Sequence, residues 1–411
     1  MAGTSTPTCS GTKSAAATRG DRDPGGSPRR TPDDQPVTSV AFHADQLFYP
    51  VPGGIGTYVR KLVPAMLAAD PTCRLTLFHA RFDQGSGADP PERWMRDHWV
   101  EELPGRIGRL YPSWALLGRP ALPAGLGSLD VLHAPSPSAV PPPGPKQRLV
   151  VTVHDLAFLV HGETYPPRWR AMFRAGLRRA LKSAHALIAV SRYTAEDLVR
   201  LTRVHPSRVH VAPLAPSLPD SGADVEEVLS RLKVRRPYVL FNGTLEHRKN
   251  VVRLVRAYRR VASRGLPHSL VLAGALGWRP HELLAEIAAE APGDVVLTGR
   301  LSAGELDALY RGATAFAYPS LYEGFGLPVL DAMARGIPCV VSTSSSLPEV
   351  VGEAALLADP RSVGSIADAV HRLLTDDALA ARLGEAGRVR AARYTWEDAA
   401  RITLEVYRSV R

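Results

Sequence analysis

The sequence predicts an α/β protein of two domains, and three observations support this prediction. The chain has 411 residues, which is longer than a single hydrophobic core usually extends. Apolar runs of four to eight residues alternate with helical or loop segments, as in parallel sheets that are buried on both faces. A proline-rich stretch at residues 209–219 interrupts this alternation, which then starts again. We therefore expect two Rossmann-like domains with parallel sheets that face an interdomain cleft.

Residues 1–36 are predicted to form a disordered tail. Ser, Thr, Gly, Pro and charged residues dominate this segment, and it lacks the apolar region of a signal peptide. The three cysteines, Cys9, Cys73 and Cys339, lack the paired spacing of a zinc site or a disulfide framework. These features favour a reducing, cytoplasmic location.

The first predicted domain spans residues 37–215. It begins with an apolar strand at 37–42, a glycine-rich loop at 52–56 and a helix at 57–67. Further strands are expected at residues 74–78, 130–133, 149–153 and 186–190. A stiff connector over residues 135–145 carries six prolines and cannot be helical.

The second predicted domain spans residues 216–393 and repeats the strand and helix alternation. Its strands are expected at residues 238–241, 269–273, 295–298, 315–318 and 338–342. Ligands of such domains bind where the carboxyl ends of the strands meet the cleft.

The formal net charge of +10 is weak evidence for a partner. It could indicate nucleic acid, an anionic membrane or a phosphorylated substrate, but the chain is also rich in Ala, Gly, Pro and Arg, a bias that a GC-rich genome produces by itself. Nucleic acid is not expected as a partner. No stretch approaches the roughly 18 consecutive apolar residues of a spanning helix, so any membrane contact is expected to be peripheral.

A basic helix is predicted at residues 166–182. Its arginines could contact an anionic membrane, with Trp169, Met172 and Phe173 on the apolar side. Alternatively, the apolar residues face the domain core, and the arginines are solvated or contact acceptor phosphate.

The most informative motif spans residues 322–331, where a strand is followed by two glycines and a helix with Pro328 at its first position. Backbone amides at such a helix start can face an anion. Glu323 and Asp331 flank this turn, and carboxylates suit sugar hydroxyls because each accepts hydrogen bonds from a diol. Taken alone, two acids eight residues apart arise easily by chance.

A second motif spans residues 242–250 and directly follows the first strand of the second domain. Arg248 offers a planar fork and Lys249 a mobile point charge, which together can neutralise a diphosphate. The alternative is a solvated basic loop.

The first domain contributes two weaker signals. Gly53, Gly54 and Gly56 would let the backbone approach a phosphate, but their spacing does not match the dinucleotide fingerprint Gly-x-Gly-x-x-Gly, which argues against an NAD enzyme. His154 and Asp155 end the predicted strand at 149–153, at the sheet edge where ligands bind. A hydrogen-bonded structural role for His154 is the alternative.

Together these motifs resemble those of the retaining GT-B glycosyltransferases of family 4, also called glycosyl transferases group 1. The stretch from Glu323 to Asp331 resembles the E-x7-E element of that family, and the loop 248–250 and the turn 347–352 resemble its mannosyltransferase-like branch. The resemblance covers nearly the whole chain beyond residue 36. One departure is Asp331, which stands where the family has a second Glu and puts a direct ribose contact in doubt.

The resemblance implies a site for a nucleotide diphosphate sugar, with GDP-mannose as the first donor to consider and no metal or other cofactor. It implies catalytic roles for His154, Glu323, Arg248 and Lys249. It also implies donor binding by Gly54, Gly243, Thr244, Arg248, Lys249, Glu323, Gly324, Phe325, Gly326, Leu327 and Asp331.

The resemblance further implies domain closure, transfer of a hexose to an acceptor hydroxyl with retention of configuration, and stabilisation of the leaving diphosphate by Arg248 and Lys249. Residues 394–411 are expected to form a helix that crosses back to the first, acceptor-side domain and braces the hinge. The acceptor could be lipid-linked or a glycan, and the protein could lie peripherally at the inner face of the membrane. A nucleotide-sugar epimerase of similar fold and a non-catalytic nucleotide-sugar binding protein are the alternatives.

Overall fold

The computed structural model describes residues 38–411 except 50–52, 83–99, 278–279 and 290–292. The tail at residues 1–36, with Cys9, lies outside the described residues, as does the start of the glycine-rich segment at Pro52.

Within the described residues, the first domain contains a parallel sheet of seven strands in the order β3-β2-β1-β4-β5-β6-β7. Its strands are β1 (Ser39–His43), β2 (Arg74–Arg81), β3 (Val100–Arg106), β4 (Val131–Ala134), β5 (Arg148–Val153), β6 (Ala186–Ala189) and β7 (Val209–Val211). In β1, Val40 and Phe42 join one apolar cluster and Ala41 joins another, so both faces of the sheet are buried.

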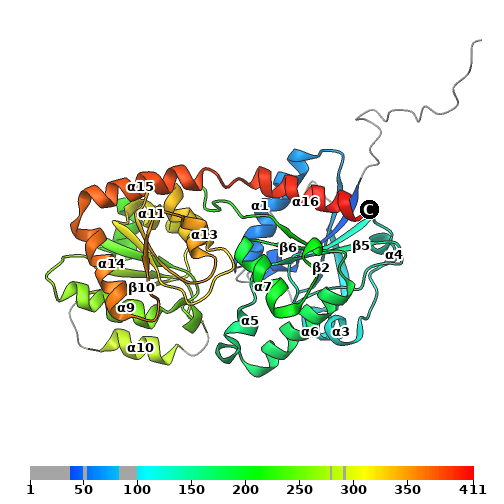
Figure 1. Cartoon of the computed structure of the whole chain (residues 1–411), viewed down its shortest axis with the longest axis horizontal. Helices are drawn as coiled ribbons and strands as arrows, with labels where there is room; N and C mark the ends of the chain where they lie inside the picture. The colour runs from blue at the N-terminus through cyan, green and yellow to red at the C-terminus, as the bar shows by residue number, and fades with distance from the viewer. Residues whose placement is uncertain (1–37, 50–52, 83–99, 278–279, 290–292) are drawn as a thin grey trace, which may run out of the picture. The chain divides into compact units, whose positions relative to one another are not determined.

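Helices cover both faces of this sheet (Figure 1). The helical segments are η2 (Asp45–Phe48), α1 (Gly53–Ala69), α3 (Ile107–Leu117), α4 (Ala124–Gly127), α5 (Ala157–Val160), η3 (Gly162–Thr164), α6 (Pro167–Ser183), α7 (Arg192–Thr202) and η4 (Pro206–Arg208). Helix α7 begins at Arg192 because the Ser191 side chain accepts a hydrogen bond from Thr194 N and so caps the first turn.

The second domain has a parallel sheet whose six described strands follow the order β10-β9-β8-β11-β12-β13. They are β8 (Tyr238–Asn242), β9 (Ser269–Ala273), β10 (Val295–Gly299), β11 (Ala315–Tyr318), β12 (Cys339–Ser342) and β13 (Leu356–Ala358). The helical segments are α8 (Val225–Arg231), η5 (His247–Lys249), α9 (Val251–Ala262), α10 (His281–Ala288), α11 (Ala303–Gly312), α12 (Leu327–Ala334), α13 (Leu347–Val351), α14 (Val363–Thr375) and α15 (Asp377–Ala391).

The last helix, α16 (Trp396–Val410), packs against α1 of the first domain, although its sequence follows the second domain (Figure 1). Thr395 caps its first turn by accepting a hydrogen bond from Asp398 N. Its buried Tyr407 hydroxyl lies within hydrogen-bonding distance of Nδ1 of His133, in strand β4 of the first sheet. The Trp396 indole donates to Pro216 O, at 2.9 Å, in the segment between the two sheets.

The strands that the sequence predicts are present, and the prediction of two parallel α/β domains is confirmed. The predicted glycine-rich loop is wrong where it can be checked. Gly53, Gly54 and Gly56 form the first turn of α1, because the helical backbone extends back to Gly53, whose carbonyl accepts a hydrogen bond from Thr57 Oγ1 at 3.2 Å. Pro328 occupies the second and not the first position of α12, where its missing N–H is equally harmless.

Candidate functional site

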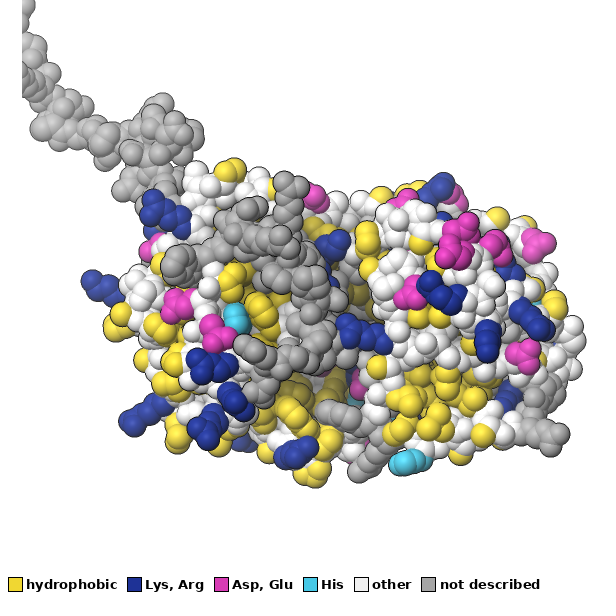
Figure 2. Space-filling model, turned by 180° about the vertical axis from the view of Figure 1, so that it is seen from behind, with side chains coloured by type: hydrophobic (Ala, Val, Ile, Leu, Met, Phe, Trp, Pro, Cys, Tyr) yellow, Lys and Arg dark blue, Asp and Glu magenta, His cyan; other side chains and the backbone are white. Residues whose placement is uncertain are grey.

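A cleft of about 690 Å³ is lined by residues of both domains, which is within the usual size range of small-ligand sites. Figure 2 shows the surface hollowed between the two halves, with Lys and Arg side chains at its margin. The structure places all the predicted site residues in its lining: Gly54, His154, Gly243, Thr244, Arg248, Lys249, Glu323, Gly324, Phe325, Gly326, Leu327 and Asp331.

Two neighbouring strands bring the two second-domain motifs together. Strands β8 and β11 pair in parallel, so the segments that follow their carboxyl ends emerge at the same edge of the sheet. Lys249 follows β8 in the short helix η5, and Glu323 follows β11. Asn250 fixes this arrangement with φ +61° and an amide that donates to Pro319 O at 2.9 Å and to Pro360 O at 2.6 Å.

Glu323, Arg248 and Lys249 form a buried ion cluster. The Glu323 carboxylate lies 2.7 Å from Lys249 Nζ through Oε1 and 3.1 Å from Arg248 Nη1 through Oε2. Arg248 also pairs with Glu246 at 2.9 Å and donates to Tyr322 O at 2.8 Å. Side chains and backbone of the protein thus hold both cations in place.

The cluster changes the protonation behaviour of its members. Burial alone would raise the pKa of Glu323, but the charges of Lys249 and Arg248 outweigh burial and lower this pKa to about 2. Burial lowers the pKa of Lys249, and the Glu323 charge opposes that effect. Lys249 Nζ also donates to the Tyr318 hydroxyl at 2.6 Å.

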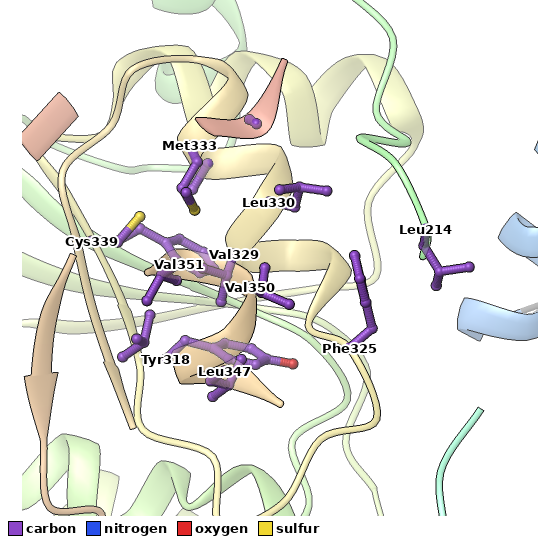
Figure 3. Close-up of a cluster of buried hydrophobic side chains, with 14 of the residues drawn as sticks. Leu214, Tyr318, Phe325, Val329, Leu330, Met333, Cys339, Leu347, Val350 and Val351 are labelled. Carbon is purple, nitrogen blue, oxygen red and sulfur yellow. The ribbon is translucent and has the colours of Figure 1, made fainter. Parts of the chain in front are cut away.

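Apolar packing anchors the segment that carries Glu323. Figure 3 shows Phe325 and Leu347 in one apolar cluster with Tyr318 of β11 and with Val329 and Leu330 of α12. These side chains are buried, so the turn between β11 and α12 is held at both ends. The backbone amides that begin α12 are thereby fixed at the edge of the cleft.

Two glycines in this turn are required by the geometry. A Cβ on Gly324 would lie 1.5 Å from His154 O, so any side chain would force the two segments apart. Gly326, which precedes α12, has φ +105°, a conformation that L-residues rarely adopt.

His154 is an uncharged imidazole at neutral pH. Burial lowers its pKa to about 4, although Asp155 and a hydrogen bond to Pro135 O act in the opposite direction. Because a carbonyl only accepts, the 3.0 Å contact of His154 Nε2 with Pro135 O places the proton on Nε2 and leaves Nδ1 as an acceptor. The structure thus gives His154 a structural hydrogen bond and a position in the cleft lining.

The Asp331 carboxylate is engaged by the chain segment between the two sheets. It accepts hydrogen bonds from Ser217 N at 2.6 Å, Ser217 Oγ at 2.9 Å and Leu218 N at 3.0 Å. Burial raises its pKa, and these hydrogen bonds oppose the rise. Ribose binding by Asp331 remains a prediction, and in this structure both of its oxygens serve residues 217–218.

Sequence reasoning missed the contribution of α1 to the cleft. Arg60 and Lys61 line it from the first domain, opposite the Arg248 and Lys249 loop of the second domain. The sequence does contain a pattern that indicates this contribution, because two adjacent cations follow the glycines by one to two helical turns.

A second cavity, of about 480 Å³, shares Ile55, His154 and Asp155 with the cleft. Trp169 and Phe173 of α6 also line it, with ring centroids 6.1 Å apart. The prediction that α6 turns apolar residues inward is confirmed for Phe173, which packs against the first-domain core.

Among the described residues, no group of three or more His, Cys, Asp and Glu side chains is arranged to hold a metal ion. Within the same residues, every helix is too short or too polar to cross a membrane.

Two family models match the chain. The model described as Glycosyltransferase Family 4 matches residues 52–215, and the model described as Glycosyl transferases group 1 matches residues 226–390. The matches fall on the first and second domains.

Two relatives and one solved structure are also similar to this chain. The chain is 34% identical to the O-antigen chain mannosyltransferase B of Escherichia coli, over 64% of this chain and 70% of that protein. It is also 34% identical to the MMP alpha-(1->4)-mannosyltransferase of Mycolicibacterium hassiacum, over 56% of this chain but only 55% of the relative. The sucrose-phosphate synthase structure from Thermosynechococcus elongatus has the same fold, with a TM-score of 0.67 and 20% identity over 90% of this chain and 98% of that chain.

Proposed function

The chain belongs to the GT-B glycosyltransferases of family 4, and we propose that it transfers mannose from GDP-mannose to an acceptor hydroxyl with retention of configuration. The observation that carries the proposal is the buried cluster of Arg248, Lys249 and Glu323 at the edge of the cleft. The mannosyltransferase names of two relatives support mannose as the donor sugar.

The charges of the cluster support a role for both domains in diphosphate binding. Arg248 and Lys249 are already paired with Glu323 and Glu246, so they alone leave little positive charge for a diphosphate. We infer that Lys61 and its neighbours on α1 supply further charge from the first domain. The cations and the amide groups at the start of α12 would then take the place of a divalent metal ion.

In the proposed reaction, the bond between the anomeric carbon and the donor phosphate oxygen breaks while the acceptor oxygen bonds to the same carbon. The leaving GDP oxygen accepts the proton of the acceptor hydroxyl, so no protein base is needed. Arg248 and Lys249 stabilise the negative charge that develops on GDP. Neutral His154 lines the cleft without adding charge near the sugar.

The second cavity is the proposed binding site of the acceptor. It adjoins the cleft at His154 and Asp155, and its Trp169 and Phe173 rings offer apolar faces on which a sugar ring can stack. A glycan acceptor, free or lipid-linked, fits this combination of aromatic and polar lining.

A peripheral contact with an anionic membrane is the second partner that we propose. Arg174, Arg178 and Lys182 lie exposed along α6, and the structure gives them no ion-pair partner among the described residues. Leu116 and Leu117, at the end of the neighbouring helix α3, are 73% and 72% exposed. Apolar side chains beside a basic helix are typical of interfacial binding. Flotation with phosphatidylglycerol vesicles, but not with phosphatidylcholine vesicles, is expected, and Leu116→Ser with Leu117→Ser should abolish it.

The donor assignment is tested by thermal stabilisation with GDP, UDP, ADP and TDP, followed by transfer from GDP-mannose. GDP should raise the melting temperature of the native protein more than the other nucleotides do. The Arg248→Ala, Lys249→Ala variant should lose this increase, and the matched variant Arg256→Ala, Arg264→Ala should keep it because these exposed arginines lie outside the cleft lining.

Two further measurements complete the test. The first uses the double variant Lys249→Met, Glu323→Gln, which removes one charge of each sign. It leaves fewer unpaired charges in the cluster than Arg248→Ala, Lys249→Ala does, so it serves as a control for a loss of binding that is caused by misfolding. Nuclear magnetic resonance of the product should show the α-anomer for retention. A melting temperature that no nucleotide raises would refute the donor site, and nucleotide binding without turnover of any nucleotide-mannose would instead favour a binding protein.

A further inference from the structure

The N-terminus of α7, in the first domain, is capped by a residue of the second domain. Arg192 N donates to Glu349 Oε1 and Tyr193 N donates to Glu349 Oε2, both at 2.9 Å. The amides at the start of a helix lack partners within the helix, and its dipole favours a negative charge there. Of the amides at the start of α7, the side chain of Ser191 accepts from that of Thr194, and Glu349 completes the cap from the second domain.

The same turn of α7 holds the backbone of the donor-site segment. Ser191 Oγ lies 2.6 Å and Thr194 Oγ1 lies 3.1 Å from Gly324 O, and both side chains are buried. One turn further along α7, Asp197 accepts a hydrogen bond from the Tyr322 hydroxyl at 2.6 Å. Residues on both sides of Glu323 are therefore fixed to the first domain.

The backbone around Glu349 is held by a second helix of the same domain. The Arg390 guanidinium of α15 donates to Glu349 O and to Val350 O, both at 2.6 Å. These two hydrogen bonds link the segment that carries Glu349 to α15 of the second domain.

These contacts are separate from the proposed nucleotide site. Glu349, Ser191, Thr194, Asp197 and Tyr322 are absent from the lining of the cleft, whereas Gly324 and Glu323 belong to it. The contacts can act on a bound donor only through the position of the segment that carries Glu323.

We propose that Glu349 is a positioning residue for the transfer reaction. By capping α7, it docks the second domain on the first and holds Glu323 and Gly324 in the closed arrangement in which the donor sugar meets the acceptor. This inference rests on the proposed function. Arg248 and Lys249 belong to the second domain, and only the α1 cations such as Lys61 come from the first domain. GDP binding should therefore depend on the cap far less than sugar transfer does.

The test compares Glu349→Gln with Glu353→Gln, a neutralisation of an exposed neighbour in the same segment. Glu349→Gln loses the charge and one of the two acceptor oxygens. We expect kcat for GDP release from GDP-mannose to fall at least 10-fold, with the GDP dissociation constant changed less than 3-fold. Glu353→Gln should match the native protein in both. Tyr322→Phe removes a single hydrogen bond of the same contact and should lower kcat in the same direction.

A second readout does not depend on turnover. Small-angle X-ray scattering of the GDP-bound proteins should show a larger radius of gyration for Glu349→Gln than for the native protein. An unchanged kcat with an unchanged radius would overturn the inference, and so would a parallel loss of GDP affinity, which would indicate general structural damage. Native protein that lacks turnover would refute the proposed function, while the scattering difference would still decide the docking role.

Discussion

Glu323→Gln removes the only negative partner of Lys249 among the described ion pairs and leaves two cations buried beside a neutral amide. In the native protein, the pKa of Glu323 is displaced from 4.5 to about 2. At 1.36 kcal/mol for each pKa unit, this displacement corresponds to about 3 kcal/mol of preferential stabilisation of the charged form. Because Glu323 is only 6% exposed, solvent screens little of this energy. We therefore expect the free energy of unfolding at pH 7 to fall by about 3 kcal/mol.

The expected loss depends on pH in a defined direction. A carboxyl group with a depressed pKa stabilises the folded state above its unfolded pKa, and this contribution is lost as the pH falls through its folded pKa. For Glu323 the contribution is fully present above about pH 4.5 and disappears toward pH 2. Gln does not titrate, so the difference between the native protein and the variant should shrink over this range.

Urea unfolding followed by circular dichroism at pH 7, 5 and 3.5 measures both effects. Glu246→Gln is the matched control, because Glu246 pairs with Arg248 at 2.9 Å but its side chain is 25% exposed. Such a partly exposed pair should contribute about 1 kcal/mol or less. A loss for Glu323→Gln no larger than that of the control, or one that stays constant between pH 7 and 3.5, would refute the reasoning.

Three other substitutions test the remaining contacts of the cleft. Burial lowers the pKa of His154 to about 4, so protonation below pH 6.5 favours the unfolded chain. His154→Asn should therefore reduce the loss of stability on acidification, which melting temperatures at pH 7 and pH 5 measure. Gly324→Ala should lower kcat about 100-fold, since a Cβ 1.5 Å from His154 O must displace the segment, while GDP binding in a calorimeter stays intact. Asp331→Asn should reduce the free energy of unfolding by about 2 kcal/mol in urea titrations, because an amide cannot accept all three hydrogen bonds from residues 217–218. A stability equal to that of the native protein would show that Asp331 does not hold this segment.

The sequence alone was sufficient for features that depend on local patterns. Buried parallel strands are continuous apolar runs, so β5 and β9 could be placed from residues 149–153 and 269–273. Arg248, Lys249 and Glu323 could be singled out because they follow such strands, and the strand ends of a parallel sheet share one edge.

Short or polar strands escaped prediction for a physical reason. Strand β3 is an edge strand with Glu101, Glu102 and Pro104, so it carries no apolar run, and β13 is only three residues long. Their pairing is decided by the neighbouring strands β2 and β12.

Only the tertiary structure decided which partners the site residues have. The resemblance makes Asp331 a candidate ribose ligand, and only the structure shows that its carboxylate accepts from Ser217, 114 residues earlier in the chain. Glu349 caps a helix that begins 157 residues before it. A hydrogen bond between residues so far apart leaves no periodicity or spacing in the sequence, because its geometry arises only when the two domains are packed together. The residue types of the site were thus set by local sequence, and their partners by the packing of the domains.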